Sequence, residues 1–430
     1  VRTSLLLLFL LSTTVAVVSA QPSPPGATSP ADTSSETTSE PTSSLTISQA
    51  LALAEKNSPA LAESAASVSR AEAGIQSAKA YTNPSFEFLG GHQSARSIAT
   101  PGVPGALLHY SGSQTIEIPH ERRTRIGTAK LELEGTEYRS VSVRLAVAAD
   151  VKRVFYDVVR RKEQLAQARD NLTLVEDLRR RVQMEVQVGE KGKLELTRAE
   201  AELARAQSAV RSANVELASA RALLKAAIGS SSDDLFDAKG SLVEAPVMQS
   251  LHEMRTRILA EHPALKQAST QTQQAQLAIE HEQARRIPEP TVYGEYERQP
   301  DISFYRFGVT VPLPLWDRRK GPIAEAQAEA KRTQAAANQV RLQLMAALER
   351  AYDQYQISNE QVKSLEAGSL HEAEAAVDAA RAAYRFGERG IVEVLDAQRV
   401  LQGVRSDLLD AQYARQSALI DLEELGAVSQ

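Results

Sequence analysis

The chain contains no cysteine, and its 430 residues include one tryptophan and eight phenylalanines. Without cysteine there can be no disulfide and no thiolate metal site, and we expect no lipid anchor on a mature N-terminal cysteine. The formal net charge of -5 gives no basic field of the kind that marks a nucleic-acid-binding protein. Aromatic residues make up 5% of the sequence, whereas Ala, Glu, Gln and Arg are abundant. This composition is typical of long helices packed in pairs.

The first 20 residues have the features of a secretory signal peptide. Arg2 precedes an apolar centre at Leu5 to Leu11, and Val18-Ser19-Ala20 offers a cleavage site. A transmembrane anchor is the weaker alternative, because the apolar stretch is shorter than the about 20 residues that a spanning helix needs. Residues 21–46 are rich in Pro, Ser and Thr, so we expect them to be disordered.

One octet, Gly-Glu-basic-Gly-x-aliphatic-Glu-aliphatic, occurs at Gly189–Leu196 and again at Gly387–Val394. The seam of small and large apolar residues after each octet recurs in the same register. The sequence therefore predicts a duplicated helical hairpin, with a first repeat at 47–229, a linker at 230–246 and a second repeat at 247–426.

The helices around the octets are predicted to be very long. No proline occurs within 135–189 or 323–387, and only Gly368 interrupts the second stretch. Helices of about 65 residues would extend roughly 100 Å. The return helices, at 193–228 and 391–425, place large apolar residues opposite small ones, so that their partners can approach closely.

Two segments, at about 85–118 and 291–312, change from helical periodicity to strict alternation. Each is predicted to be a β-hairpin with one apolar face, and strands of about 9 to 10 residues suit a tilted crossing of a bilayer. Tyr110 and Trp316 are placed near strand ends, where their rings suit the headgroup level, although a packing role is an equal alternative.

Four strands cannot close a barrel, and lipid does not tolerate an unpaired sheet edge. Closure must therefore come from further chains, and three copies would supply twelve strands, an even number within the range of outer-membrane barrels. The expected fold class is an α+β membrane protein, with long antiparallel helical hairpins and four strands per protomer in a trimeric twelve-stranded β-barrel.

Two segments resemble a known family. Tyr384–Ala397 looks like the periplasmic tip of the TolC-like outer-membrane efflux channels, and the order of helices and strands resembles that family from about 45 to 425. Phe307–Gly321 is similar to the branch that includes the CzcC-like outer component of heavy-metal efflux systems. The resemblance implies a homotrimer whose outer-membrane β-barrel continues across the periplasm as an α-helical barrel.

The resemblance also implies partners and a function. A periplasmic adaptor (membrane fusion) protein and an inner-membrane proton-driven pump of the RND type would dock below the channel, which passively conducts heavy-metal cations and needs no cofactor. One alternative keeps the channel but changes its cargo to drugs, organic compounds or a secreted polypeptide. A second is a periplasmic coiled-coil structural or adaptor protein. No residue pattern supports an enzyme.

The resemblance places a gate at the tip. Glu393 and Asp396, which share one face of a first helical turn, match acidic residues that ring the entrance and favour cations. Tyr384 and Arg389 match residues that bridge neighbouring hairpins, with Glu195 as their acidic partner. Two simpler alternatives stay open: the acidic pair complements the helix dipole, and an exposed ion pair contributes under about 1 kcal/mol.

The glycines of the two octets allow the chain to reverse between antiparallel helices. A phosphate-binding loop is rejected, because helices lie on both sides. The two turns form the end that would meet an adaptor. The expected docking surface comprises Gly189, Glu190, Lys191, Gly192, Gly387, Glu388 and Gly390.

The seven histidines have no paired spacing that favours a metal site. His92 and His109 are placed near an extracellular loop, where they could contact an exiting metal ion, although solvated loop residues are the commoner case. No specific metal ligand is predicted.

Overall fold

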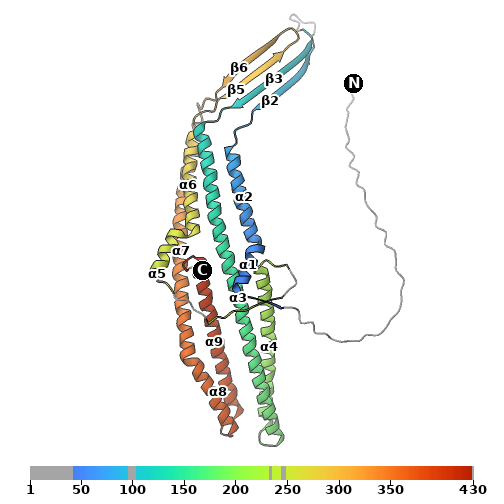
Figure 1. Ribbon diagram of the computed structural model, residues 1–430, viewed down its shortest axis with the longest axis vertical. Helices are drawn as coiled ribbons and strands as arrows, with labels where there is room; N and C mark the ends of the chain where they lie inside the picture. Colours follow the sequence, from blue (N-terminus) through green and yellow to red (C-terminus); the bar gives the residue numbers. More distant parts are fainter. Residues whose placement is uncertain (1–41, 95–102, 232–234, 244–247, 429–430) are drawn as a thin grey trace, which may run out of the picture. The chain divides into compact units, whose positions relative to one another are not determined.

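The computed structural model describes residues 42–94, 103–231, 235–243 and 248–428 (Figure 1). The expected signal peptide, and most of the segment expected to be disordered, lie outside the described residues. The helices of the first half are α1 (Ile47–Asn57), α2 (Pro59–Lys79), α3 (Pro119–Gln187) and α4 (Lys193–Ala227). Those of the second half are α5 (Leu251–Glu261), α6 (Pro263–Ala284), α7 (Lys320–Ser364), α8 (Leu370–Arg385) and α9 (Ile391–Glu424).

Capping boxes fix the start of α1 and of α5. The Thr46 side chain accepts a hydrogen bond from the Gln49 N–H, and the Gln49 side chain accepts one from the Thr46 N–H at 2.9 Å. Ser250 and Glu253 do the same for α5. Each box satisfies amide groups that the helix itself leaves unpaired.

The long helix of the first half is α3, which has 69 residues and at 1.5 Å per residue extends roughly 100 Å. Its counterpart is not one α-helix. A π-helical turn at Leu365–Ser369 separates α7 from α8 and contains Gly368. Glycine favours helix less than other residues except proline, which makes this a weak point in the hydrogen-bond ladder. None of the described helices is long and apolar enough to cross a membrane.

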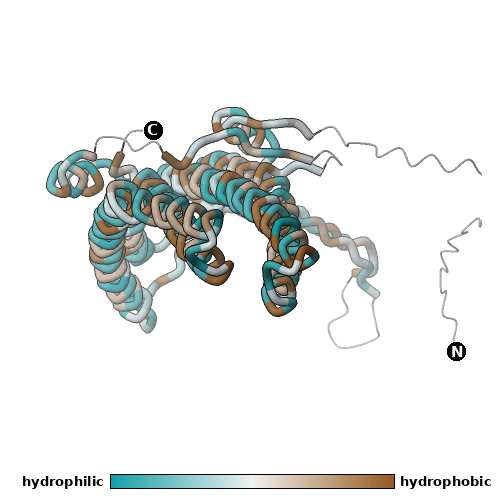
Figure 2. The backbone as a smooth tube through the Cα atoms, turned by 90° about the horizontal axis from the view of Figure 1, so that it is seen from below, coloured by the Kyte–Doolittle hydropathy of each residue, from teal (hydrophilic) through white to brown (hydrophobic). Residues whose placement is uncertain are grey.

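The helices pack mainly in antiparallel pairs. α3 packs against α4 along its second half and against α2 and α6 nearer its start, while α9 packs against α7, α8 and α3. Figure 2 shows hydrophilic and hydrophobic residues on different sides of these helices. The buried residues of α4 combine small and large side chains, and all but the first belong to the predicted seam: Ala199, Ala206, Leu217, Ala220 and Leu224.

The core of the first half lies between α3 and α4, around the fully buried side chains of Phe155, Leu224 and Ile228. Two short strands, β1 (Thr42–Leu45) and β4 (Leu235–Ala238), pair in parallel beside it. The segment expected to be disordered up to 46 therefore ends in a strand, and the linker expected at 230–246 contains that strand's partner. Each strand is too short to show an alternating pattern, and each pairs with a partner far along the chain.

Charged side chains hold this small sheet on the helices. Lys162 and Arg221 donate to the Asp237 carboxylate at 2.8 and 3.0 Å. Burial opposes ionisation of Asp237, but these two hydrogen bonds outweigh it and lower the pKa of the carboxyl. The buried Arg415 donates to the carbonyls of Leu242 and Val243 at 3.2 and 2.9 Å, which fixes the chain just after β4.

A second sheet contains β2 (Ser85–Gln93), β3 (Gly105–Thr115), β5 (Thr291–Arg298) and β6 (Ser303–Thr310). All its pairs are antiparallel, and the order is β2-β3-β5-β6, so the two expected hairpins join through β3 and β5. Figure 1 shows this sheet beyond the start of α3, while the turn to α4 lies at the other end of that helix.

The two faces of the four-stranded sheet differ. One carries a row of rings, Phe88, Tyr110, Tyr296 and Tyr305, with neighbouring centroids 5.0, 6.2 and 4.8 Å apart. Tyr110 is therefore in the middle of the sheet and not at a strand end. The other face carries polar side chains in register: Glu87, Ser111, Glu295 and Arg306.

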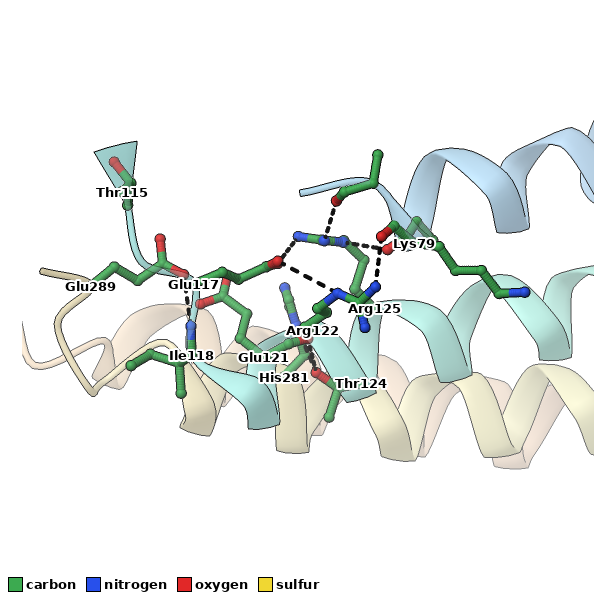
Figure 3. Close-up of polar contacts among 12 residues, drawn as sticks. Lys79, Thr115, Glu117, Ile118, Glu121, Arg122, Thr124, Arg125, His281 and Glu289 are labelled. Carbon is green, nitrogen blue, oxygen red and sulfur yellow. Dashed lines mark hydrogen bonds and ion pairs between the residues drawn. The ribbon is translucent and has the colours of Figure 1, made fainter. Parts of the chain in front are cut away.

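The passage from β3 to α3 is a compact polar cluster (Figure 3). Glu117 falls within the hairpin predicted at about 85–118, but the structure buries it beyond β3, with its side chain 4% exposed and paired with Arg125. Arg125 and Arg122 also donate to the carbonyls of Ala78 and Lys79 at 3.1 and 2.7 Å. These arginines thus cap the end of α2 and tie it to the start of α3.

Replacing Phe155 by Ala is expected to lower the free energy of unfolding by about 3–5 kcal/mol, because the ring is 1% exposed in the α3–α4 core and would leave a cavity. The thermal midpoint of the purified protein in detergent, followed by circular dichroism, checks this. Phe386→Ala is the matched control, since that ring is 80% exposed and should unfold as the parent does. Equal midpoints for the two variants would contradict the assignment of the core.

Candidate functional site

Two chain reversals connect the long helices, and they have the same geometry. Gly189 and Gly387 have φ angles of 82° and 72°, in the left-handed region that glycine adopts at little cost. The N–H of Glu190 donates to the Glu185 carbonyl and that of Glu388 donates to the Ala383 carbonyl, both at 2.9 Å. These six-to-one bonds are those of a Schellman motif, which explains the glycine in each octet.

An apolar cluster lies just above the two turns and holds the hairpins α3–α4 and α8–α9 together. Val182 and Ile391 are fully buried in it, and Tyr384 is 7% exposed. Its other buried members are Leu178, Ala199, Val394 and Leu395. The two tips of one protomer are therefore one packed unit.

Tyr384 makes the polar contact between the hairpins. Its hydroxyl donates to a Glu185 carboxylate oxygen at 2.5 Å. Burial, followed by the hydrogen bond and charge of Glu185, raises the pKa of Tyr384 well above its usual range. The phenol thus keeps its proton at neutral pH, and the contact is lost only as the pH rises above the ordinary tyrosine value of about 10.

The expected acidic partner, Glu195, lies near Tyr384 but does not accept its hydrogen bond. One of its carboxylate oxygens is buried and has no hydrogen-bond partner among the described residues, and it adds only negative charge near Tyr384. Glu185 was not predicted, because it is not repeated in the second copy of the hairpin. Its counterpart there is Ala383. Its position one helical turn before Gly189 was the available signal.

Arg399 forms a second link that the sequence did not reveal. It donates to Glu202 of α4 at 2.9 Å and to Asp396 of its own helix at 3.0 Å. Asp396 is thus engaged by an arginine, while Glu393, on the same helical face, is exposed and forms no ion pair within the described part of the chain. The structure brings Tyr384 and Glu195 together, but it leaves Arg389 exposed without a side-chain partner among the described residues.

A cleft of roughly 600 Å³ opens between α3 and the α8–α9 hairpin beside Tyr384. Its charged lining residues include Asp177, Arg181, Asp378 and Arg381. The two signs alternate, so the cleft presents no single field to a ligand. Among the described residues, no group of three or more His, Asp or Glu is arranged to hold a metal ion.

The two histidines placed near a loop lie in strands. His92 belongs to β2 and His109 to β3, where His109 is opposite Leu89 and Glu297. Strand β3 starts earlier than the alternation indicated, which moves His109 into the sheet.

Very long antiparallel hairpins, closed by glycine turns at one end and joined to a two-faced sheet at the other, are the architecture of the TolC-like outer-membrane channels. Comparison with known proteins supplies the family. The family model described as outer membrane efflux protein matches residues 50–230 and 255–427. The chain belongs to this family, and its location is the outer membrane of a Gram-negative bacterium, extending into the periplasm.

The chain is similar to two resistance proteins over most of its length. It is 26% identical to the cobalt-zinc-cadmium resistance protein CzcC of Cupriavidus metallidurans, over 83% of this chain and 84% of the relative. It is 27% identical to the nickel-cobalt-cadmium resistance protein NccC of Alcaligenes xylosoxydans xylosoxydans, over 72% and 69%. A crystal structure of CusC has a TM-score of 0.75 with 19% identity, covering 88% and 91%, which shows the shared fold.

Replacing Tyr384 by Phe should loosen the two tips, because a hydrogen bond to a charged group contributes about 1.5–3 kcal/mol. Since the chain has no cysteine, spin labels on Glu190→Cys and Glu388→Cys report the distance between the turns specifically. We expect a broader and longer distance distribution in Y384F. Tyr138→Phe is the control, because the Tyr138 hydroxyl donates to Glu134 within one helix, at 3.2 Å. An unchanged distribution in Y384F would show that the contact does not hold the tips.

Proposed function

We propose that this outer-membrane efflux protein is the exit duct of a tripartite efflux system, assembled as a homotrimer that passively conducts heavy-metal cations to the outside. The observation that carries the proposal is the four-stranded sheet, which has a row of rings on one face, polar side chains in register on the other, and two edges, β2 and β6, that pair with no further strand among the described residues. Such a sheet is suited to lipid on one side and water on the other.

The free edges support the trimer. The hydrocarbon core offers no hydrogen-bond partner to backbone N–H and C=O groups. The edge strand β2 of one protomer must therefore pair with β6 of the next. Three sheets of four strands close a twelve-stranded barrel, a size known among outer-membrane barrels. Threefold symmetry then extends the helical hairpins as an α-helical barrel into the periplasm.

The tip supports a gate. Tyr384 to Glu185 and Arg399 to Glu202 both link the two hairpins by directional contacts, which can break without unfolding the helices. Glu393 and Asp396 begin α9 beside these links, and in a trimer they supply six carboxylates to an entrance that favours cations. Arg389 is exposed, and in the proposed trimer its partner belongs to a neighbouring protomer.

The exposed turns at 189–192 and 387–390 are the proposed docking surface for a periplasmic adaptor, with an inner-membrane proton-driven RND-type pump below it. The pump supplies the energy, and the channel carries out no chemical step. The cargo is inferred from the two resistance proteins for cobalt, zinc, cadmium and nickel, which the chain matches over most of its length. Drugs, organic compounds and secreted polypeptides are the alternative cargoes.

The combined variant Arg389→Ser and Tyr384→Phe is expected to raise single-channel conductance in planar bilayers severalfold, because it removes contacts that constrict the entrance. The control is Arg211→Ser, which changes an exposed arginine midway along α4. If both variants conduct as the parent does, these residues do not form the gate. Absence of any channel from the parent protein would instead refute the proposed function.

Deleting the gene from its host should reduce tolerance to zinc, cobalt or cadmium salts and leave tolerance to drugs unchanged. Growth at graded metal and drug concentrations, with the gene restored on a plasmid, measures this. Loss of drug tolerance with unchanged metal tolerance would overturn the metal assignment and favour the alternative cargo.

A further inference from the structure

The segment 311–320, which leads from β6 into α7, projects large apolar side chains away from the protein. On the apolar face of β6, Tyr305, Phe307 and Val309 alternate with residues of the polar face. The same alternation continues past the last paired residue of the strand. Its exposed members are Val311, Leu313 at 69% and Leu315 at 61%, followed by Trp316 at 92%.

This segment is held in a defined conformation. The Leu315 N–H donates to the Leu313 carbonyl at 2.9 Å, and the Arg319 N–H donates to the Asp317 carboxylate at 2.8 Å. The Arg319 side chain donates twice to Glu282 of α6, at 2.9 and 2.5 Å. The apolar side chains are therefore presented outward by an anchored loop.

The equivalent passage from β3 to α3 behaves differently. There Glu117 is buried against Arg125, and the Ile116 N–H donates to the Pro290 carbonyl at 2.8 Å. A chain can thus pass from strand to helix without exposing a cluster of large apolar side chains. The exposure at 313–316 is a specific feature of the second passage and calls for an occupant.

Backbone hydrogen bonding limits how deeply the 311–320 segment can enter a bilayer. Pro312 and Pro314 have no N–H, so this segment cannot continue the ladder of the sheet, and its carbonyls need polar partners that the hydrocarbon core lacks. The transfer of two exposed leucine side chains and a tryptophan side chain out of water lowers the free energy. The headgroup region satisfies both requirements, and it is where tryptophan is enriched.

The charge next to these side chains fits the same layer. Arg318 and Lys320 are exposed, and neither forms an ion pair within the described part of the chain. Asp317, the acidic residue nearby, is engaged by the Arg319 amide. Two unpaired cations beside an apolar cluster match the phosphates of a phospholipid surface.

We propose that the 311–320 segment is an interfacial anchor, which seats Leu313, Leu315 and Trp316 in the headgroup layer of the periplasmic leaflet and places Arg318 and Lys320 on lipid phosphates. The inference rests on the proposed function, since it requires the four-stranded sheet to cross the bilayer. Contact of Trp316 with a neighbouring protomer is the competing outcome.

Trp316 is the one tryptophan of the chain, so its fluorescence tests the proposal in the unmodified protein. The full-length protein is reconstituted into phospholipid vesicles brominated either near the headgroup or near the end of the acyl chain. We expect blue-shifted emission, loss of most of the fluorescence with the shallow bromine, and weak quenching with the deep one. Leu313→Ser with Leu315→Ser should shift the emission to the red and weaken the shallow quenching.

Emission that no brominated lipid quenches would overturn the anchor. Shielding from aqueous iodide as well would then place Trp316 against another protomer, whereas strong iodide quenching would place it in water. Conductance is recorded on the same vesicles, so failure of the channel is distinguished from failure of the anchor. Trp316→Phe, which removes the signal, gives the fluorescence background.

Discussion

Backbone hydrogen bonding is the constraint on which this molecule depends. Within the part of the chain that the structure describes, the four-stranded sheet satisfies its inner strands but leaves one side of β2 and one side of β6 unpaired. In water those groups would bind solvent, and in lipid they cannot remain free. The proposed trimer is the consequence, and the threefold arrangement of the helices and of the tip follows from closing the sheet.

The two halves of the chain are similar in backbone but differ in the side chains that join them. Residues common to both octets shape the chain, as the left-handed glycines of the Schellman turns show. The contacts that link one hairpin to the other come from residues without a counterpart. Glu185 corresponds to Ala383, and Arg399 corresponds to Ala201. Two similar hairpins thus pack against each other through different side chains, which gives the tip a specific geometry.

The strand-to-helix passages show the same asymmetry. One is fixed by the buried carboxylate of Glu117, which pairs with the partly exposed Arg125 and lies 3.9 Å from Arg122. The other is fixed by Arg319 and Glu282 and keeps its apolar side chains outside. The sheet is therefore tied to the helices by ion pairs at both passages.

Local patterns in the sequence were sufficient for the long helices, the glycine turns and the alternating strands, because period, capping and turn chemistry act over a few residues. They did not indicate the pairing of β1 with β4, since each strand has four residues and depends on a partner far along the chain. They also misplaced Tyr110 and Glu117, because alternation gives a face but not the point where a strand ends.

What the sequence alone determined is the long helices, the two glycine turns, the two β-hairpins and the family resemblance, because each depends on neighbouring residues. Only the tertiary structure decided that Tyr384 meets Glu185 and that Arg399 reaches Glu202. Such partners lie almost 200 residues apart, and their meeting depends on how two hairpins rotate against each other. That rotation is set by the packing of the apolar cluster around Val182 and Ile391, which no local pattern specifies.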